Sequence, residues 1–372
     1  MSRHTEFGVE ERFFDEPSDA SRLKHHVVTD YFVSFTNVLA RNRDVGYADL
    51  FAGPGVYKNG EKSIPVLITE RVVSDERLRR HVRLWFNEGD PALAQQLRKN
   101  VFAVPDVNLL AHRPAVTNKV VGADLRDKQY SIPTLVFADP CGYKGLSLRM
   151  IAAALRGFGN DCLFFFNYRR VNMKLSFPVM DESINGFFSD ELAADLRRQI
   201  ASLKPRARED AVLDAIREAI RGAGGIPLVF RFKSCEGGGT SHHLVFASKS
   251  PKGANIMKRI MNSCSSQVFD GVGSFEFDPK MPDSSNLLLF SPITDLADRL
   301  LEVFAGQTLT FDDMVQKEAA ETRFTDTNYR DAVLQLETEF RIEVDPPAKA
   351  RRMQGGGVKR TLPGESSLRF PD

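Results

Sequence analysis

The sequence predicts an α/β chain whose parallel β-sheet is covered by helices on both faces and followed by a small helical module. Short runs that are apolar on both faces recur at 46–52, 83–88, 108–112, 134–139 and 161–167. Helical stretches separate them, at 64–80, 91–104 and 146–157. Strands buried on both faces and joined by helices are typical of a parallel sheet.

A helix is expected before the sheet, after an irregular polar segment over 1–20. From Ser21 to Arg41 apolar residues recur at helical spacing. The first turns of this helix carry a basic cluster, which consists of Arg22, Lys24, His25 and His26. This cluster forms either a solvated face or a lid over an anionic ligand.

The sheet is expected to end in a hairpin. A charged, mostly helical insertion covers 172–222, and strands at 226–234 and 242–249 then follow with a glycine-rich connector between them. So short a connector favours an antiparallel pair. Five parallel strands closed by an antiparallel pair is the layout of class I methyltransferases, so the sequence predicts this Rossmann-like fold over 21–290.

The last part of the chain, 291–372, has a different pattern. Thr310 and Thr325 can each cap a helix, the first ending near Lys317 and the second near Glu339. Two strand-like pieces around a basic, Gly- and Pro-rich loop follow them. Two helices and a basic hairpin predict a winged-helix domain.

Composition narrows the class of protein. Of 372 residues, 42% are hydrophobic and 27% charged, which is ordinary for a globular protein, and the net charge is +1. Any contact with nucleic acid must therefore come from a local patch. The four cysteines form no CxxC pair, no apolar run reaches the length of a membrane helix, and the N-terminus lacks a signal peptide. We expect a cytoplasmic protein with no metal site and no membrane contact.

The strongest functional motif is DLFAGPG, from Asp49 to Gly55, which ends the first predicted strand. Glycine allows the backbone to approach a ligand closely and to adopt positive φ. An acidic residue four positions before Gly53 suits a ligand with a cationic amino-acid group. No P-loop is present, and the third glycine of a dinucleotide motif is missing at Lys58. The motif resembles the S-adenosylmethionine (SAM) loop of DNA and RNA methyltransferases, so Asp49, Phe51, Gly53 and Gly55 are expected to bind SAM.

An acidic pair ends the second predicted strand. Glu88 is the first candidate to accept both ribose hydroxyls of an adenosine, and Asp90 is the second. After the third strand, class I enzymes often have a residue that binds the adenine amino group. The sequence reads His112-Arg113-Pro114 there, so Asn118 or Asp124 is the expected replacement.

The fourth predicted strand ends in FADPCGYKG, on the edge where open α/β sheets bind ligands. Amino-methyltransferases that act on bases carry Asp-Pro-Pro-Tyr or similar here, with an acid for the exocyclic amine and a ring that stacks on the base. Asp139, Pro140, Tyr143 and Lys144 are therefore the expected catalytic residues.

Two neighbouring features leave alternatives open. Pro140-Cys141 is also similar to the nucleophile motif of cytosine-C5 enzymes, but no further motif of that class is evident, so a small buried thiol is the preferred interpretation. Asn167-Tyr168-Arg169-Arg170, after the fifth strand, either orients substrate or forms a polar loop end.

Basic and polar residues of the tail are the candidates for nucleic-acid binding. The presumed recognition helix opens with Asn328 and Arg330, and the wing carries Arg351, Arg352, Lys359 and Arg360. Wings neutralise phosphates, and the N-terminal side chains of a recognition helix reach base edges. Winged helices also serve as protein-docking modules, and that alternative stays open.

The combination of motifs resembles the prokaryotic three-Cys-motif partner protein family. The resemblance rests on FFDEPSDASRLKHHVVTDYF at 13–32, YADLFAGPG at 47–55, FADPCGYKGLSLRMI at 137–151, DCLFFFNYRRVNM at 161–173, the HHLVFASKS…MKRIM block and the TDTNYRDAVLQLE…FP tail. It covers nearly the whole chain. It implies a SAM-methyltransferase-like fold and a three-cysteine, radical-SAM-like partner protein, whereas Cys141 stands where members often have a bulky aromatic residue.

The sequence therefore predicts a SAM-dependent methyltransferase that acts on nucleic acid or a modified base and works with a three-cysteine partner. The alternative is a non-catalytic subunit that binds nucleic acid on the same fold and supports a partner enzyme. A nicotinamide-dependent enzyme is a third hypothesis.

Overall fold

The computed structural model describes residues 15–119, 130–140, 145–175, 182–234, 239–280, 291–354 and 359–372. The chain divides into two compact units, the first of 1–260 with 277–279 and the second of 261–276 with 280–372. The sequence predicts a boundary at 291. Residues before it join the second unit because Val272 is buried in that unit's hydrophobic core.

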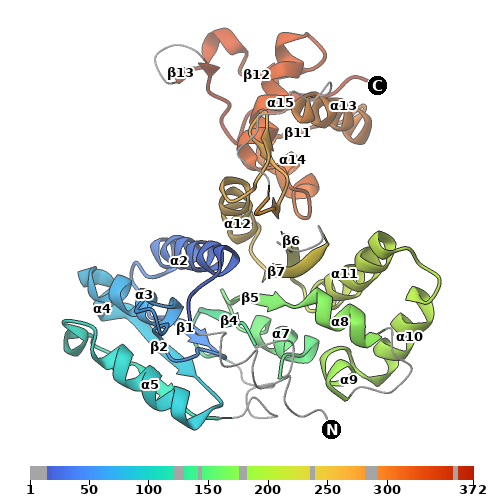
Figure 1. Ribbon diagram of the computed structural model, residues 1–372. Coiled ribbons are helices and arrows are strands. Elements are labelled where there is room, and N and C mark those ends of the chain that lie inside the picture. The colour runs from blue at the N-terminus through green and yellow to red at the C-terminus, as the bar shows by residue number, and fades with distance from the viewer. Residues whose placement is uncertain are drawn as a thin grey trace. The chain divides into compact units, whose positions relative to one another are not determined.

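An eight-stranded sheet lies at the centre of the first unit, in the order β10-β6-β7-β5-β4-β1-β2-β3 (Figure 1). Its strands are β1 (Val45–Asp49), β2 (Val82–Asn87), β3 (Ala115–Thr117), β4 (Thr134–Ala138), β5 (Asp161–Phe166), β6 (Ile226–Lys233), β7 (Thr240–Ser248) and β10 (Glu276–Phe277). Strands β1 to β5 pair in parallel, whereas β7 is antiparallel to both β5 and β6. This is the strand order of class I methyltransferases, and the predicted fold class is confirmed. The structure adds that β7 lies between β5 and β6, so β6 runs in the same direction as β1 to β5.

Helices cover both faces of this sheet, as Figure 1 shows. One face carries α2 (Asp19–Leu39), α3 (Ile64–Val73), α4 (Glu76–His81) and α5 (Pro91–Phe102). The other carries α7 (Leu148–Leu155), α8 (Tyr168–Leu175), α9 (Glu182–Phe188), α10 (Asp190–Ile200) and α11 (Pro205–Gly222). The strands need this double cover because both of their faces are apolar: every residue of β1, β4 and β5 is buried.

The prediction of a strand over 108–112 is wrong. The chain instead forms a 3-10 turn, η1 (Val107–Leu109), and Leu109 is half exposed. Asp106 adopts a left-handed φ of 60°, so the chain turns at the start of the apolar run instead of extending. The third strand, β3, comes later, where Val116 is buried and pairs with Phe86.

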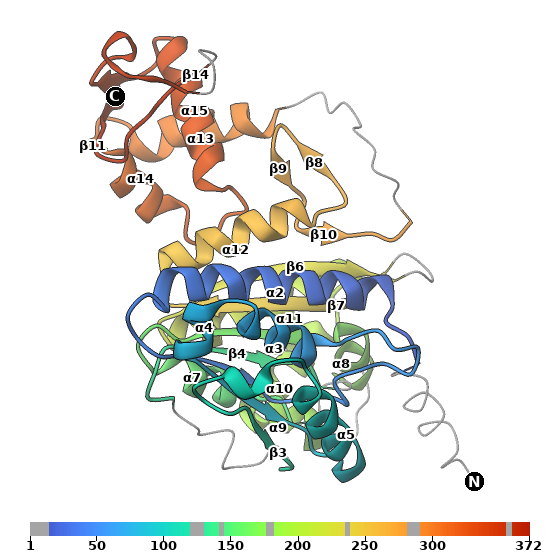
Figure 2. The ribbon, with the colours of Figure 1, turned by 90° about the vertical axis from the view of Figure 1, so that its left-hand side faces the viewer.

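Helix α2 lies along the sheet of the first unit (Figure 2) and connects several of its elements. Ser18 caps its N-terminus, since its side chain accepts a hydrogen bond from the backbone N–H of Ser21. The side chains of Val28 and Phe32 are fully buried on its apolar face. The Tyr31 hydroxyl donates a 2.7 Å hydrogen bond to Asp161 at the start of β5. This bond ties the middle of α2 to the amino end of β5, while Lys24 in its first turns contacts Asp139, just after the carboxyl end of β4.

The second unit has the predicted winged-helix arrangement. Its helices are α13 (Pro292–Phe304), α14 (Phe311–Glu318) and α15 (Asp326–Thr338), and α12 (Pro251–Ser263) leads into it. Its short strands and 3-10 turn are β8 (Val268–Phe269), β9 (Val272–Gly273), β11 (Thr308–Thr310), β12 (Glu343–Asp345), η2 (Ala348–Ala350), β13 (Met353–Gln354), β14 (Lys359–Arg360) and β15 (Ser367–Arg369). Strands β11, β15 and β12 form an antiparallel sheet, and β13 and β14 form the wing hairpin.

Within the described part of the chain, the helices are all too short or too polar to cross a lipid bilayer.

Candidate cofactor and substrate site

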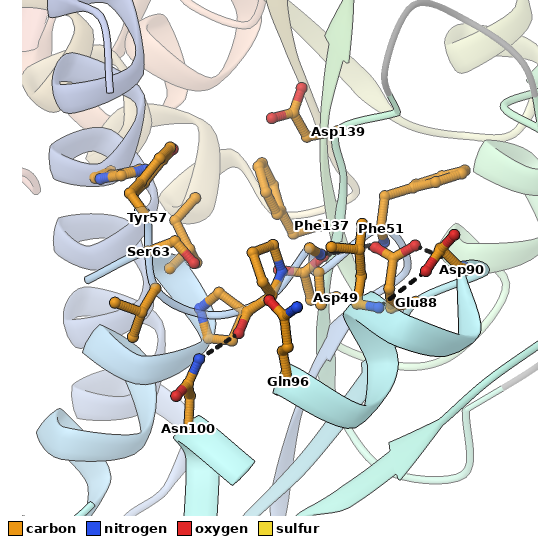
Figure 3. A pocket seen from close by; sticks show the side chains of 18 of the residues that line it. Asp49, Phe51, Tyr57, Ser63, Glu88, Asp90, Gln96, Asn100, Phe137 and Asp139 are labelled. Carbon is orange, nitrogen blue, oxygen red and sulfur yellow. Dashed lines mark hydrogen bonds between the residues drawn. The ribbon is translucent and has the colours of Figure 1, made fainter. Parts of the chain in front are cut away.

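A cavity of about 1020 Å³ lies in the first unit, at the carboxyl ends of β1, β2 and β4 (Figure 3). Ligands of open α/β sheets bind at this edge, and the volume is at the upper end of that of small-molecule pockets. The cavity is lined by the loop after β1, the acidic residues after β2 and β4, the first turns of α2 and one side of α5. Asp49, Phe51, Gly53, Glu88, Asp90 and Asp139, all predicted from the sequence, lie in this lining.

The loop after β1 turns sharply at its two glycines. Gly53 and Gly55 have φ values of 64° and 84°, a region that side-chain-bearing residues disfavour. A Cβ on Gly55 would also lie 3.3 Å from both Leu97 and Val66, so Gly55 serves the packing of the turn, whereas Gly53 lines the cavity. The Asn100 side chain donates a 2.8 Å hydrogen bond to the carbonyl between the two glycines and holds the turn in place.

Asp49 lies beneath this loop and is 2% exposed. One of its oxygens accepts a hydrogen bond from the Phe51 N–H at 3.1 Å. Burial raises the pKa of Asp49 well above its ordinary value, the Phe51 hydrogen bond opposes this, and the nearby carboxylates of Asp139 and Glu88 raise it further. A cation in the cavity would favour the ionised form of Asp49, so this end of the cavity suits a cationic group.

Glu88 joins the two loops of the site. Its Oε2 accepts a 2.8 Å hydrogen bond from the Gly53 N–H, and its Oε1 accepts one of 2.9 Å from the Asp90 N–H. Asp90 in turn caps α5, because its carboxylate accepts hydrogen bonds from the N–H groups of Ala92 and Leu93. Each carboxylate oxygen of Glu88 has a further lone pair for a ligand hydroxyl.

An unexpected ion pair lies at the other end of the cavity. The Lys24 Nζ contacts Asp139 Oδ2, and the two side chains are 9% and 19% exposed. The same ammonium group lies 4.2 Å from the centre of the Phe165 ring. Next to it, His25 Nε2 is 3.2 Å from the Tyr57 hydroxyl, and burial, together with the Lys24 charge, lowers the pKa of His25 to about 4.

The basic cluster of α2 is thus divided between two surroundings. Arg22 and His26 are exposed and pair with Glu61 and Asp30, as the solvated-face alternative predicts. Lys24 and His25 line the cavity. The sequence held a signal for Lys24, since it stands three, four and seven positions before residues 27, 28 and 31, all of which are buried, and so shares their helix face.

Other predicted residues of this edge have structural roles or lie outside the described residues. Cys141, Tyr143, Lys144 and Asp124 belong to the undescribed segments. Pro140 is buried. The Asn118 side chain donates hydrogen bonds to the carbonyls of Glu88 and Gly89 at 2.8 and 2.9 Å, so it shapes the loop after β2. Asn167 accepts a hydrogen bond from the Arg170 N–H at the start of α8.

Three of the residues expected to contact nucleic acid have partners within the second unit. Asn328 is buried in a capping box with Thr325, and its amide donates to the carbonyl of Gly271. Arg330 donates to the carbonyl of Leu362 and lies over the Phe311 ring. Arg351 is buried and forms an ion pair with Glu337. The recognition helix needs Asn328 and Arg330 for its own packing.

The remaining three predicted contacts belong to the wing. Arg352 is exposed just before β13. Lys359 and Arg360 form β14, and their side chains lie outside the described part of the structure.

Comparison with known proteins agrees with this architecture. The family model of the GMT-like wHTH domain, a winged helix-turn-helix, matches residues 276–349. No curated protein matches the chain.

Solved structures similar to the chain include three bacterial proteins. A protein of Legionella pneumophila is 15% identical, over 62% of this chain and 85% of that chain, with a TM-score of 0.36. A predicted O-methyltransferase of Agrobacterium tumefaciens is 16% identical, over 54% and 72%, with a TM-score of 0.28. A TehB-like SAM-dependent methyltransferase of Corynebacterium glutamicum is 12% identical, over 59% and 88%, with a TM-score of 0.29. Because these proteins are at most 16% identical to this chain, its function is inferred from its own cavity.

Proposed function

We propose that the first unit binds SAM and transfers its methyl group to a nucleic acid or a modified base. One observation carries this proposal: a glycine turn with two positive φ angles lies between a buried carboxylate and a second carboxylate bonded to that turn. A cationic amino acid joined to a nucleoside would meet Asp49 and Glu88 at the same end of the cavity, on either side of the glycine turn.

The residues present fit such a ligand. Asp49 supplies negative charge under the loop, and Gly53, which has no side chain, lines the cavity wall. The remaining lone pairs of Glu88 suit the ribose hydroxyls. Ser63 fits as well, since its hydroxyl oxygen is buried beside the cavity with no partner among the described residues and could bond a polar group of the ligand.

The chain's own contribution would be alignment and electrostatics. When bound, SAM supplies the electrophilic methyl group on its sulfonium. Asp139 stands at the carboxyl end of β4 on the cavity wall, where it can accept a hydrogen bond from the group to be methylated. The pair with Lys24 keeps that carboxylate oriented. We propose that Tyr143 and Lys144, which follow in the sequence, complete the substrate side.

Calorimetry tests the cofactor. We expect micromolar binding of SAM and S-adenosylhomocysteine (SAH), and no binding of NAD. Gly53→Asp should abolish binding. The new carboxylate repels the neighbouring carboxylate of Glu88, and it fills the space that the ribose needs. Gly222→Asp, at the end of α11 with no atom within 4 Å of its added Cβ, is the matched control and should bind normally. NAD binding without SAM binding would support the nicotinamide hypothesis instead.

Transfer of labelled methyl groups from SAM to total DNA and RNA tests the reaction. We expect incorporation that Asp139→Ala reduces at least a hundredfold while SAH affinity stays within threefold. If SAM binds but no acceptor is labelled, the result would favour the alternative hypothesis of a non-catalytic subunit that delivers nucleic acid to a partner enzyme.

The second unit has a narrower role in this proposal than the sequence suggested. We propose that the wing residues Arg352, Lys359 and Arg360 contact phosphates, while α15 reads no bases because Asn328 and Arg330 are engaged elsewhere. The resemblance to three-Cys-motif partner proteins further supports the proposal of a three-cysteine, radical-SAM-like partner. Co-purification of the two proteins expressed together tests that proposal.

A further inference from the structure

Lys24 is a charged residue on a helix face that is otherwise apolar. Residues 27, 28 and 31 of the same face are buried, and Lys24 itself is 7% exposed. Burying an ammonium group is costly unless a carboxylate offsets its charge. Asp139 provides that carboxylate from a different element of the fold, 115 positions later in the chain.

The surroundings leave the Lys24 ammonium little freedom. It lies against the Phe165 ring on one side and the Asp139 carboxylate on the other. Helix α2 is itself fixed, since Tyr31 binds Asp161 of β5. Asp139 is thereby held at a defined place on the cavity wall, at the upper side in Figure 3, away from Glu88 and Asp90.

This ion pair is coupled to the cofactor end of the cavity. The charge of Asp139 raises the pKa of Asp49, and the charge of Lys24 lowers it. The cavity lining contains four carboxylates, those of Asp49, Glu88, Asp90 and Asp139. Lys24 is the buried cation of that lining and cancels part of their field.

We propose that Lys24 is a positioning residue that orients the Asp139 carboxylate and offsets its charge, and so sets how strongly the cavity prefers a sulfonium over a neutral thioether. The inference rests on the proposed binding of SAM. Without Lys24, an unpaired Asp139 would attract the sulfonium of SAM and have little effect on the uncharged sulfur of SAH. Without Asp139, an unpaired Lys24 would repel the sulfonium.

The test is a double-mutant cycle read out by calorimetry as the ratio of the SAH Kd to the SAM Kd, at pH 8. For charges several ångströms apart at a pocket wall, a change of about tenfold is expected. Lys24→Met should raise the ratio about tenfold, Asp139→Asn should lower it about tenfold, and the double variant should return it to within threefold of the wild-type value. Lys24→Arg, which keeps the charge, should also stay within threefold.

The matched control is Lys62→Met, because Lys62 is an exposed lysine that pairs with Glu70 and does not line the cavity. It should leave the ratio unchanged. Thermal melting checks that each variant folds, and if Lys24→Met does not fold, the opposite shift in Asp139→Asn decides. Ratios within twofold of wild type in both single variants, with both ligands still binding, would overturn the role of Lys24. Failure of the wild-type chain to bind either ligand overturns the proposed function, and this inference with it.

Discussion

The two units of the chain carry opposite charge. The first unit, residues 1–260 and 277–279, contains 38 Lys and Arg against 31 Asp and Glu, a net charge of +7, whereas the second unit, residues 261–276 and 280–372, contains 12 against 18, a net charge of −6. The total of +1 conceals this division. A polyanion would be attracted to the methyltransferase-like unit, and the winged-helix unit as a whole would repel it.

Within each unit the local charge is the reverse of the total. The cavity of the basic unit is lined by four carboxylates and three lysines, so its lining is negative by one charge. In the acidic unit, residues 311–338, which include α14 and α15, contain three basic and seven acidic residues, whereas residues 346–364, around the wing, contain five basic and no acidic ones. The net charge of a unit therefore determines whether it attracts a charged ligand from a distance, whereas the charge at the site depends on the residues that line it.

The two units also differ in the ionisable group that each of them buries. This difference gives the largest expected effect on stability. The first unit buries Asp161, which accepts hydrogen bonds from Tyr31 and Ser248, and burial raises its pKa to about 6. The folded state then binds a proton more tightly than the unfolded state does. The stabilisation is complete below the ordinary pKa near 4 and is lost as pH rises through 6.

We expect this group to lower the unfolding free energy of the first unit by about 3 kcal/mol between pH 4 and 7. Asp161→Asn should remove that pH dependence, while Asp214→Asn, at an exposed carboxyl, should keep it. Urea unfolding followed by the fluorescence of Trp85, the one tryptophan of the chain, reports this unit. The same pH slope in Asp161→Asn would show that another group is responsible.

The second unit buries a guanidinium instead. Arg351→Ala would leave Glu337 without its partner and the Thr361 carbonyl without a donor, so the unit should lose about 2 kcal/mol of unfolding free energy. Hydrogen exchange in α15 measures this. The exposed neighbour Arg352→Ala should exchange like the wild type. Equal exchange in both variants would argue against a structural role for Arg351.

The local charge of the wing predicts a smaller effect, on binding. Replacing Arg352, Lys359 and Arg360 together by Ala should weaken binding to duplex DNA and reduce the slope of log K against log[salt] by about 2.7, three phosphate contacts at about 0.9 each. Duplexes of scrambled sequence should bind as well as any other. An unchanged slope would place the phosphate contacts on the basic first unit instead.

The smallest expected effect is proton release when a ligand binds in the acidic cavity of the basic unit. Because burial and then its neighbouring carboxylates raise the pKa of Asp49, a cationic ligand should release part of a proton when it binds at pH 7. Calorimetry of SAM binding in buffers of different ionisation enthalpy measures this fraction. SAH, which keeps the ammonium group that Asp49 is proposed to meet, should release a similar fraction, and Asp49→Asn should release none. No release with either ligand would mean that no cationic group approaches Asp49.

Much of this molecule could be read from local patterns. The apolar runs at β1, β2, β4 and β5 predicted those strands, because burial on both faces leaves a continuous apolar signature. DLFAGPG and the acidic residues after β2 and β4 predicted the cavity wall, because parallel strands bring their carboxyl ends to one edge of the sheet. The third strand was missed because its three residues carry too short a pattern.

Other features depended on contacts between distant segments. Lys24 became part of the site only because α2 packs beside the end of β4. No local sequence pattern around Lys24 predicts its contact with Asp139, which lies 115 positions later. Asn328, Arg330 and Arg351 have the residue types of a nucleic-acid surface, yet partners from elsewhere in the second unit engage them. The sequence by itself determined which segments are buried and which loops meet at the sheet edge, because periodicity and chain direction are local properties. Only the tertiary structure decided which charges face a ligand and which face each other, because a charged side chain takes its role from its partner in space.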